Sequence, residues 1–255
     1  MNFVKPKKGL GQHFLKDNNI AEKIVDSLTF NNYTNVLEIG PGMGVLTKFL
    51  LPKENIKFKA VEIDRESVAY LKDNLNIVHE NIIQSDFLKL NLNEVFDNNY
   101  AIIGNFPYNI SSQILFHVLD YNQKIPEVVG MFQKEVALRL ASKPNCKAYG
   151  ILAILLQCYY DIEYLFTVNE TVFFPPPKVK SGVIRLIRKK DFVADYDEVL
   201  FKTIVKTAFN QRRKTLRNAL KPLNKDLSSV SENILNKRAE QLFISDFVDL
   251  TKLLG

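Results

Sequence analysis

Apolar residues in the first part of the chain alternate between helical spacing and the short runs that are typical of buried strands. Asp17 precedes apolar residues at helical spacing, which predicts that it is the N-cap of a helix over 18–28. Further helices are expected over 45–51, over 66–75 and to 119 after a cap at Ser111 or Ser112. Strands are expected at 35–39, 58–63, 76–78 (with 82–83 beyond it) and 100–104. Such alternation predicts a parallel sheet with helices on both faces.

The second part of the chain changes character near residue 190. Strands are expected at 127–132, 161–166 and 182–187. Residues 191–195 look like a linker, and the remainder has the pattern of helices only. The sequence therefore predicts an α/β protein with a Rossmann-like sheet in residues 1–190 and a small all-helical domain in residues 191–255.

Composition places the chain among ordinary globular proteins. Its 255 residues, 46% hydrophobic and 24% charged, suffice for one large domain with a small appendage. The longest apolar run, 151–156, is too short to cross a bilayer, and the N-terminus lacks the apolar core of a secretory signal. Cys146 and Cys158 have no partners at metal-ligand spacing. We therefore expect a cytoplasmic protein with reduced thiols and without a metal, and we expect a monomer.

The net charge of +6 is modest, but basic residues are concentrated in three segments without any acid. Residues 1–16 contain four lysines, residues 171–190 six basic residues and residues 199–225 eight. Any one of these segments could be a solvated face. Three of them in one chain favour a polyanionic partner. The candidate RNA contacts are Lys178, Lys180, Arg212, Arg213, Lys214 and Arg217.

A glycine-rich turn, Gly40-Pro41-Gly42-Met43-Gly44, follows the first predicted strand of the sheet. Glycines at a strand-to-helix turn allow a ligand to approach the backbone where a Cβ would block it. A dinucleotide-binding turn would place its third glycine at position 45, which is valine here. The turn is similar to the one that S-adenosylmethionine-dependent methyltransferases wrap around the methionine part of the cofactor. Taken alone, it could also be a plain connector.

Two acidic residues support a cofactor site. Glu62 lies 22 residues after Gly40 at the end of the second predicted strand, where a carboxylate can accept hydrogen bonds from both ribose hydroxyls. Asp86 follows the third predicted strand, where it can accept from the exocyclic amine of the cofactor adenine. Either acid alone would be read as a solvated loop residue. Together with Gly40 and Gly42 they favour a site for S-adenosylmethionine.

The motif Asn105-Phe106-Pro107-Tyr108 directly follows the fourth predicted strand. The exocyclic nitrogen of adenine is a poor nucleophile because its lone pair is delocalised into the ring. Two acceptors, the Asn105 side-chain oxygen and the Phe106 carbonyl, would favour a pyramidal nitrogen and free that lone pair. Pro107 stiffens the turn, and Tyr108 can stack on the base. The alternative is a plain turn with a core tyrosine, and this motif class acts on amino nitrogens of bases or of amides, so it does not select RNA.

Along nearly its whole length the chain resembles the small-subunit ribosomal RNA adenine N6,N6-dimethyltransferase family (KsgA/RsmA type). The family usually has leucine at the position of Phe106, and we expect little consequence because the backbone carbonyl matters there. The matching segments, in the family's order and spacing, are 9–15 (Gly-Leu-Gly-Gln-His-Phe-Leu), 38–42, 62–64, 104–111, 133–137, 147–150 and 173–181.

The resemblance implies roles that the residues alone do not. His13 and Leu15 would touch the cofactor, and Tyr108 and Phe173 would sandwich an extruded target adenine. Without the resemblance, Phe173 would be read as a core or proline-packing residue and His13 as a surface histidine. The implied product is N6,N6-dimethyladenosine at two adjacent adenosines near the 3′ end of 16S rRNA. A role in late small-subunit maturation and a link to the response to kasugamycin are implied as well.

Several other functions remain as alternatives. Macrolide-resistance methyltransferases of large-subunit rRNA share the cofactor turn and the reaction motif, but residues 208–218 look like the small-subunit type. A DNA adenine methyltransferase would need a target-recognition domain, which the sequence does not suggest. A small-molecule methyltransferase would need neither the basic segments nor the helical appendage. A non-catalytic rRNA-binding assembly factor could lack Glu62, Asn105 or Tyr108, all of which are present.

Overall fold

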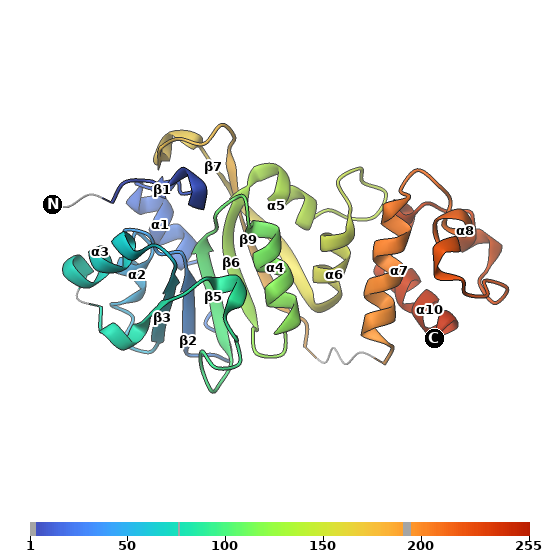
Figure 1. The fold of residues 1–255 in the computed structure, drawn as a ribbon, viewed down its shortest axis with the longest axis horizontal. Helices are drawn as coiled ribbons and strands as arrows, with labels where there is room; N and C mark the ends of the chain where they lie inside the picture. The colour runs from blue at the N-terminus through green and yellow to red at the C-terminus, as the bar shows by residue number, and fades with distance from the viewer. Residues whose placement is uncertain (1–3, 76, 191–194) are drawn as a thin grey trace. The chain divides into compact units, whose positions relative to one another are not determined.

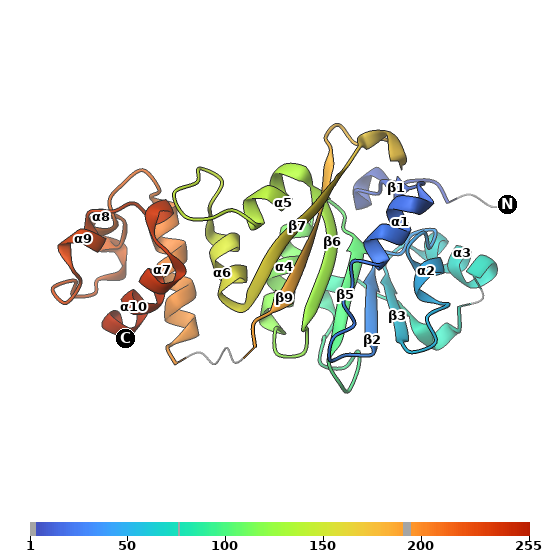
Figure 2. The same ribbon diagram turned by 180° about the vertical axis from the view of Figure 1, so that it is seen from behind.

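The computed structural model describes residues 4–75, 77–190 and 195–255 of the chain (Figures 1 and 2). Its described residues form two compact units. The first comprises the chain up to Ala137 together with Asp161–Arg188, and the second comprises Leu138–Tyr160 together with the chain from Lys189 on. The expected division at residue 191 differs from this grouping, because residues 138–160 pack with the C-terminal residues. Residues 191–194 of the expected linker lie outside the described part, and the functional assignment of the two domains stays a prediction.

The first unit is built on a twisted seven-stranded sheet with the order β4-β3-β2-β5-β6-β9-β7. The pairs from β4 to β6 are parallel, and β9 pairs antiparallel with β6. The chain fills one half of the sheet before it crosses to β5, so β2 and β5 are neighbours at the point where the order reverses. Ligands of such sheets bind beyond the carboxyl ends of the strands at this point. The strands are β2 (Asn35–Ile39), β3 (Lys57–Glu62), β4 (Ile82–Gln84), β5 (Tyr100–Asn105), β6 (Glu127–Gln133), β7 (Tyr160–Val168) and β9 (Ser181–Arg188).

Helices cover both faces of this sheet. In Figure 1 α4 lies in front of it, and in Figure 2 α1 does. The predicted cap of α1 is confirmed, because the Asp17 carboxylate accepts from the amides of Asn19 at 2.9 Å and Ile20 at 3.1 Å. The expected serine cap of α4 is wrong, because the helix begins at Ser111 and Ile110 is the cap residue. The helices are α1 (Asn18–Val25), α2 (Thr47–Leu50), α3 (Arg65–Leu75), α4 (Ser111–Asp120) and α5 (Lys134–Leu140).

The predicted α/β fold is confirmed, but its third strand lies later in the chain than the apolar pattern suggests. No strand covers residues 77–78, and Asn76 lies outside the described residues. Ile77 instead packs against α3 in a small cluster with Val68 and Leu71. A turn follows, and only then does β4 pair with β3. The correction has a physical cause, since an apolar residue that covers a helix gives the same local signal as a strand.

A second, two-stranded sheet joins distant parts of the first unit. β1 (Phe14–Leu15) pairs antiparallel with β8 (Phe173–Phe174), so that Leu15 lies opposite Phe173. Both of these side chains are buried in the main apolar core, at 3% and 1% exposure. This pairing holds the N-terminal segment beside the proline-rich loop that follows β8.

The second unit is helical from residue 195 onward, apart from one isolated bridge between Thr215 and Arg238. The unit also includes α6, whose buried residues lie all around the helix. Such a helix must be covered on every side, and it packs against α7 and α10. Among the described residues, no helix is both long and apolar enough to cross a membrane. The helices are α6 (Ile151–Tyr159), α7 (Glu198–Asn210), α8 (Leu216–Ala219), α9 (Glu232–Leu235) and α10 (Ile244–Leu254).

Candidate functional site

The glycine turn after β2 borders the main pocket of the first unit. Gly40, Gly42 and Gly44 have φ of 63°, 57° and 75°, which residues with a Cβ rarely adopt. A Cβ on Gly40 would meet nothing within 4 Å, so this residue leaves open space toward the pocket. A Cβ on Gly42 would lie 2.8 Å from the Phe14 ring, and one on Gly44 would lie 2.2 Å from Leu75. The first glycine therefore faces the pocket, whereas the other two permit close packing.

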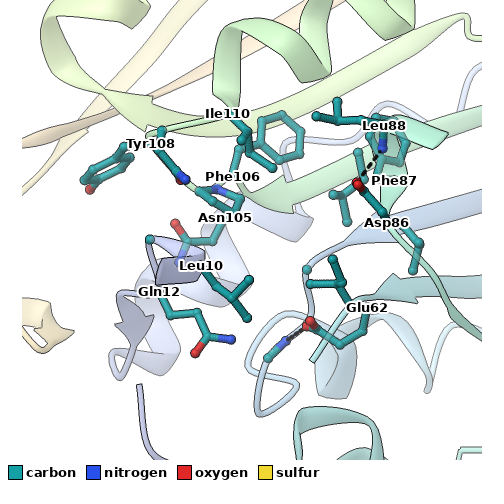
Figure 3. Close-up of a pocket in the computed structure, with 18 of the residues that line it drawn as sticks. Leu10, Gln12, Glu62, Asp86, Phe87, Leu88, Asn105, Phe106, Tyr108 and Ile110 are labelled. Carbon is teal, nitrogen blue, oxygen red and sulfur yellow. Dashed lines mark hydrogen bonds between the residues drawn. The ribbon is translucent and has the colours of Figure 1, made fainter. Parts of the chain in front are cut away.

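Glu62 stands at the end of β3 and is 5% exposed. Its Oε2 accepts from the amide of Gly42 at 3.1 Å, and its Oε1 accepts from the amide of Asp64 at 2.9 Å (Figure 3). Burial raises the pKa of this carboxyl, while backbone hydrogen bonds from Asp64, Gly42 and Ile63 oppose the rise. Each carboxylate oxygen has two lone pairs, so the group keeps capacity to accept a further hydrogen bond. The predicted ribose-binding acid is thus fixed in place and can still accept from a ligand.

Asp86 lies on the same side of the pocket as Glu62 (Figure 3). Its Oδ1 accepts from the amide of Leu88 at 3.0 Å and caps the turn Phe87–Lys89. Phe87 and Leu88 add apolar surface beside the carboxylate, and Ile63 from the loop after β3 also lines the pocket. A carboxylate beside an apolar wall suits a flat heterocycle that carries an amine.

Asn105, the last residue of β5, borders the pocket on the side opposite Asp86 (Figure 3). Its Nδ2 donates to the backbone oxygen of His13 at 2.9 Å. A side-chain amide has donors on one edge and an acceptor on the other. Because the His13 carbonyl can only accept, the Nδ2 edge is turned toward the N-terminal segment. The Oδ1 of Asn105 remains as the acceptor for another group.

Phe106 and Pro107 continue the chain into a tight turn. The amide of Phe106 donates to the Met131 oxygen at 3.2 Å, and the amide of Ile110 donates to the Pro107 oxygen at 3.2 Å. The Phe106 ring is 1% exposed and packs edge-on against Phe132, with the ring centroids 5.1 Å apart. The side chain of Phe106 therefore acts as a core residue, and its carbonyl stays the predicted second acceptor.

Tyr108 is held by two groups from distant segments. Its hydroxyl lies 2.6 Å from Ser181 Oγ at the start of β9, and burial raises the pKa of the phenol. The His13 ring stacks on the Tyr108 ring at a centroid distance of 5.5 Å and an interplanar angle of 26°. His13 Nδ1 also lies 2.7 Å from the Pro175 oxygen. His13 thus lies against the proposed base-stacking residue as well as in the lining of the main pocket.

Two residues that the resemblance assigned to the site do not line the main pocket. Leu15 borders a separate cavity of about 30 Å³ beside the glycine turn, whereas the main pocket measures about 230 Å³. Phe173 is 1% exposed and lies in the apolar core, while its neighbour Phe174 is 44% exposed. The structure therefore places Phe173 in the core, as the sequence without the family resemblance suggests. Its role in stacking on the target adenine stays a prediction.

The candidate RNA contacts fall into two groups. Lys178 and Lys180 are exposed in the loop before β9, and Arg213 and Lys214 are exposed in the second unit. The other two have acidic partners within the second unit, since Arg212 Nε lies 2.5 Å from Glu240 and Arg217 forms an ion pair with Glu232. Arg212 also donates to the Lys147 oxygen at 2.5 Å. The role of these six residues in RNA binding stays a prediction.

Several pocket residues were not predicted from the sequence. They come from the N-terminal segment and from the loops after β4 and β5, next to residues that were predicted. Adjacency to Asp86 and Asn105 was the available signal, since a loop that presents one residue to a ligand usually presents its neighbours. The described residues contain no group of three or more His, Cys, Asp or Glu side chains placed to hold a metal ion. The unpredicted pocket residues include Leu10, Gln12, Phe87, Leu88 and Ile110.

Known proteins resemble the chain over almost its full length. The family described as "Ribosomal RNA adenine dimethylase" matches residues 4–254. A protein of Flavobacterium johnsoniae named "Ribosomal RNA small subunit methyltransferase A" is 56% identical over 99% of this chain and 97% of its own length. A protein of the same name from Cytophaga hutchinsonii is 57% identical over 100% of this chain and 99% of its own length.

Solved structures agree with these relatives. A dimethyladenosine transferase from Plasmodium falciparum has a TM-score of 0.76 and 27% identity, and the match covers 93% of this chain and 96% of that one. The 23S rRNA methyltransferase ErmE has a TM-score of 0.67 at 23% identity over 94% and 99% of the two chains, which shows a shared fold. The chain is therefore a methyltransferase of the ribosomal RNA adenine dimethylase family.

Proposed function

We propose that the chain transfers methyl groups from S-adenosylmethionine to N6 of two adjacent adenosines near the 3′ end of 16S rRNA. The product would be N6,N6-dimethyladenosine, and the step would belong to maturation of the small subunit. The observation that carries the proposal is that Gly40, Glu62, Asp86 and Asn105 border one pocket at the carboxyl ends of neighbouring strands. A cytoplasmic location follows from the proposed substrate, and we expect the protein to act as a monomer.

The residues around the pocket fit S-adenosylmethionine. Gly40 leaves open space where a side chain would stand. Glu62 keeps capacity to accept from the ribose hydroxyls, and Asp86 can accept from the adenine amine. When bound, S-adenosylmethionine supplies a methyl group on a sulfonium, which is already activated for attack. The protein therefore has to position the reacting groups and adjust the nucleophile.

Asn105 and the Phe106 carbonyl are the groups that would adjust the nucleophile. Asn105 Oδ1 would accept from one N–H of the target amine, and the Phe106 carbonyl from the other. The nitrogen lone pair would then point at the methyl carbon, and the new N–C bond would form as the S–C bond breaks. The extra proton on the product nitrogen would leave to water, because a methylated exocyclic ammonium of adenine is acidic. Tyr108 would hold the base by stacking, a contact worth ~1–3 kcal/mol.

The choice of small-subunit rRNA rests on the relatives. Proteins 53–57% identical to this chain are named as small-subunit rRNA methyltransferases. The 23S enzyme ErmE shares the fold at lower identity, which carries no information on the substrate. Exposed basic residues, including Lys178 and Arg213, would contribute phosphate contacts.

The test supplies labelled S-adenosylmethionine with unmethylated small subunits, large subunits and duplex DNA in parallel. The nucleic acid is digested to nucleosides, and the labelled species is identified. Label in N6,N6-dimethyladenosine from small subunits alone would support the proposed cofactor, reaction and substrate RNA. Label in large-subunit RNA would refute the substrate, and retained binding to small subunits without any label would refute the reaction.

A further inference from the structure

A buried carboxylate beside the pocket has no part in the proposed chemistry. Asp64 follows Glu62 by two residues, and its side chain is 2% exposed. It accepts from the Glu66 amide at 3.3 Å and from Ser67 Oγ at 3.1 Å, and thus caps the start of α3. A cap needs only a neutral oxygen. The charge of Asp64 therefore calls for another explanation.

Asp64 also anchors the N-terminal segment, residues 7–15. The ammonium of Lys7 forms an ion pair with Asp64 Oδ1, and Gln12 Nε2 donates to Asp64 Oδ2 at 3.4 Å. The Lys7 amide donates to Gln12 Oε1 at 2.8 Å and closes a ring of contacts. This ring brackets the turn Lys8–Leu10, whose residues Gly9 and Leu10 line the main pocket. Burial disfavours the charge on Asp64, but the contacts with Lys7, Gln12 and Ser67 together outweigh it and pull the pKa below its ordinary value.

The other end of the same segment meets the reaction motif. The His13 carbonyl accepts from Asn105 Nδ2 at 2.9 Å. Gly11, at φ 63°, packs against Asn109 so closely that a Cβ would lie 2.3 Å from its Oδ1. His13 alone separates Gln12, which contacts Asp64, from Phe14 in β1, so displacement at the anchor is transmitted to the His13 carbonyl.

We propose that Asp64 is a positioning residue, which anchors the N-terminal segment so that the His13 carbonyl holds the Asn105 amide with its acceptor oxygen toward the target amine. This inference rests on the proposed function of Asn105. The exposed partner of Lys7 is less important. Glu66 lies 3.1 Å from the Lys7 ammonium but is 59% exposed, and solvent weakens such pairs.

The test compares Lys7→Met and Asp64→Asn with two controls. Lys7→Met leaves the cap of α3 untouched, and Asp64→Asn keeps an oxygen for it. Glu66→Gln removes only the exposed ion pair. Lys8→Met removes one positive charge at the neighbouring residue. An effect that Lys7→Met and Lys8→Met share is therefore due to weaker attraction of the rRNA and not to the anchor.

Two measurements separate anchoring from a merely structural role. The first is hydrogen exchange of amides 8–15 in the protein without cofactor, with amides 65–75 as the internal reference for α3. Lys7→Met and Asp64→Asn should speed exchange in 8–15 but not in 65–75, and the control variants should match the wild type. The second is methyl transfer at saturating rRNA, where kcat should fall roughly three- to tenfold, which corresponds to about 0.7–1.4 kcal/mol of lost transition-state stabilisation through less precise positioning of Asn105.

Unchanged exchange in both variants would overturn the anchor. Faster exchange with an unchanged kcat would overturn the link from the anchor to Asn105. The wild-type protein is assayed in parallel, so that failure of the proposed function is distinguished from failure of this inference. A wild type that transfers no methyl group refutes the proposed function, and with it the effect of Asp64 on kcat. The exchange data would still show whether Asp64 anchors the N-terminal segment.

Discussion

Replacement of Asn105 by aspartate distinguishes the role of its side-chain oxygen from that of its side-chain nitrogen. Asn105→Asp keeps an acceptor oxygen for the target amine and has almost the same shape. It replaces the Nδ2 donor, which is 2.9 Å from the His13 carbonyl, by a second acceptor. If Asn105 served only as an acceptor, the negatively charged aspartate would be at least as good. If the contact with His13 orients it, aspartate turns away from the carbonyl and the activity falls.

The expected loss follows from the bonds involved. A hydrogen bond of this kind contributes about 0.5–1.5 kcal/mol, and an unsatisfied acceptor costs about 1–3 kcal/mol. The sum, about 1.5–4.5 kcal/mol, corresponds to a fall of roughly 10- to 2000-fold in kcat. Asn105→Ala removes the acceptor itself, and loss of one such group in a transition state costs about 10²–10³-fold. Aspartate should therefore be impaired, and alanine at least as severely.

The assay is single-turnover methyl transfer at saturating cofactor, with rRNA binding measured separately at one salt concentration. Binding should not change, because it rests on phosphate contacts away from Asn105. An aspartate variant as fast as the wild type would refute the orienting role of the His13 carbonyl. An alanine variant as fast as the wild type would refute the activation of the nitrogen by Asn105.

Three further outcomes are expected. If ~6–10 phosphates are contacted, rRNA affinity should fall ~10³–10⁵-fold between 50 and 200 mM salt. Joint replacement of Arg213 and Lys214 by glutamine should lower the slope of log affinity against log salt concentration by about 2. An affinity that does not depend on salt would contradict the electrostatic argument. Burial raises the pKa of Glu38 from 4.5 to about 8, so its contribution to stability is complete below 4.5 and is lost as the pH rises toward 8. Denaturation of Glu38→Gln should therefore show a flatter pH dependence than the wild type, and equally steep curves would contradict this. In Gly130→Ala the new Cβ would lie 2.4 Å from the Phe106 ring, and we expect the free energy of unfolding to fall by about 1–3 kcal/mol. An unchanged free energy of unfolding would mean that the ring can move aside.

Much of the cofactor side could be predicted from the sequence, because parallel strands bring their carboxyl ends to one edge. The turn at Gly40 follows β2, Glu62 ends β3 and Asn105 ends β5, and all three line one pocket. Asp86 lines the same pocket, although the strand before it was expected too early in the chain. The residue directly after a strand is less sensitive to such an error than the strand itself.

The parts that the sequence did not reveal depend on contacts between distant residues. Leu15 pairs with Phe173 across 158 positions, and no local pattern announces a pairing of two-residue strands. The same pairing places Phe173 in the core, whereas the family resemblance implies that it stacks on the target base. Arg212 likewise lies in a basic segment, yet Glu240 neutralises it from elsewhere in the chain. Charge patterns predict where basic residues gather, but not which of them have acidic partners.

The phenylalanine at position 106, where the family usually has leucine, is explained by its structural neighbours. A Cβ on Gly104 would lie 2.6 Å from the Phe106 ring, and one on Gly130 would lie 2.4 Å from it. The ring therefore fills space that exists because two adjacent strands carry glycine at facing positions. Because the ring is buried, its neighbours Asn105 and Pro107 are fixed to a close-packed group. A residue can thus matter to the proposed reaction through the stiffness it gives the turn, which is why its backbone carbonyl and its side chain must be considered together.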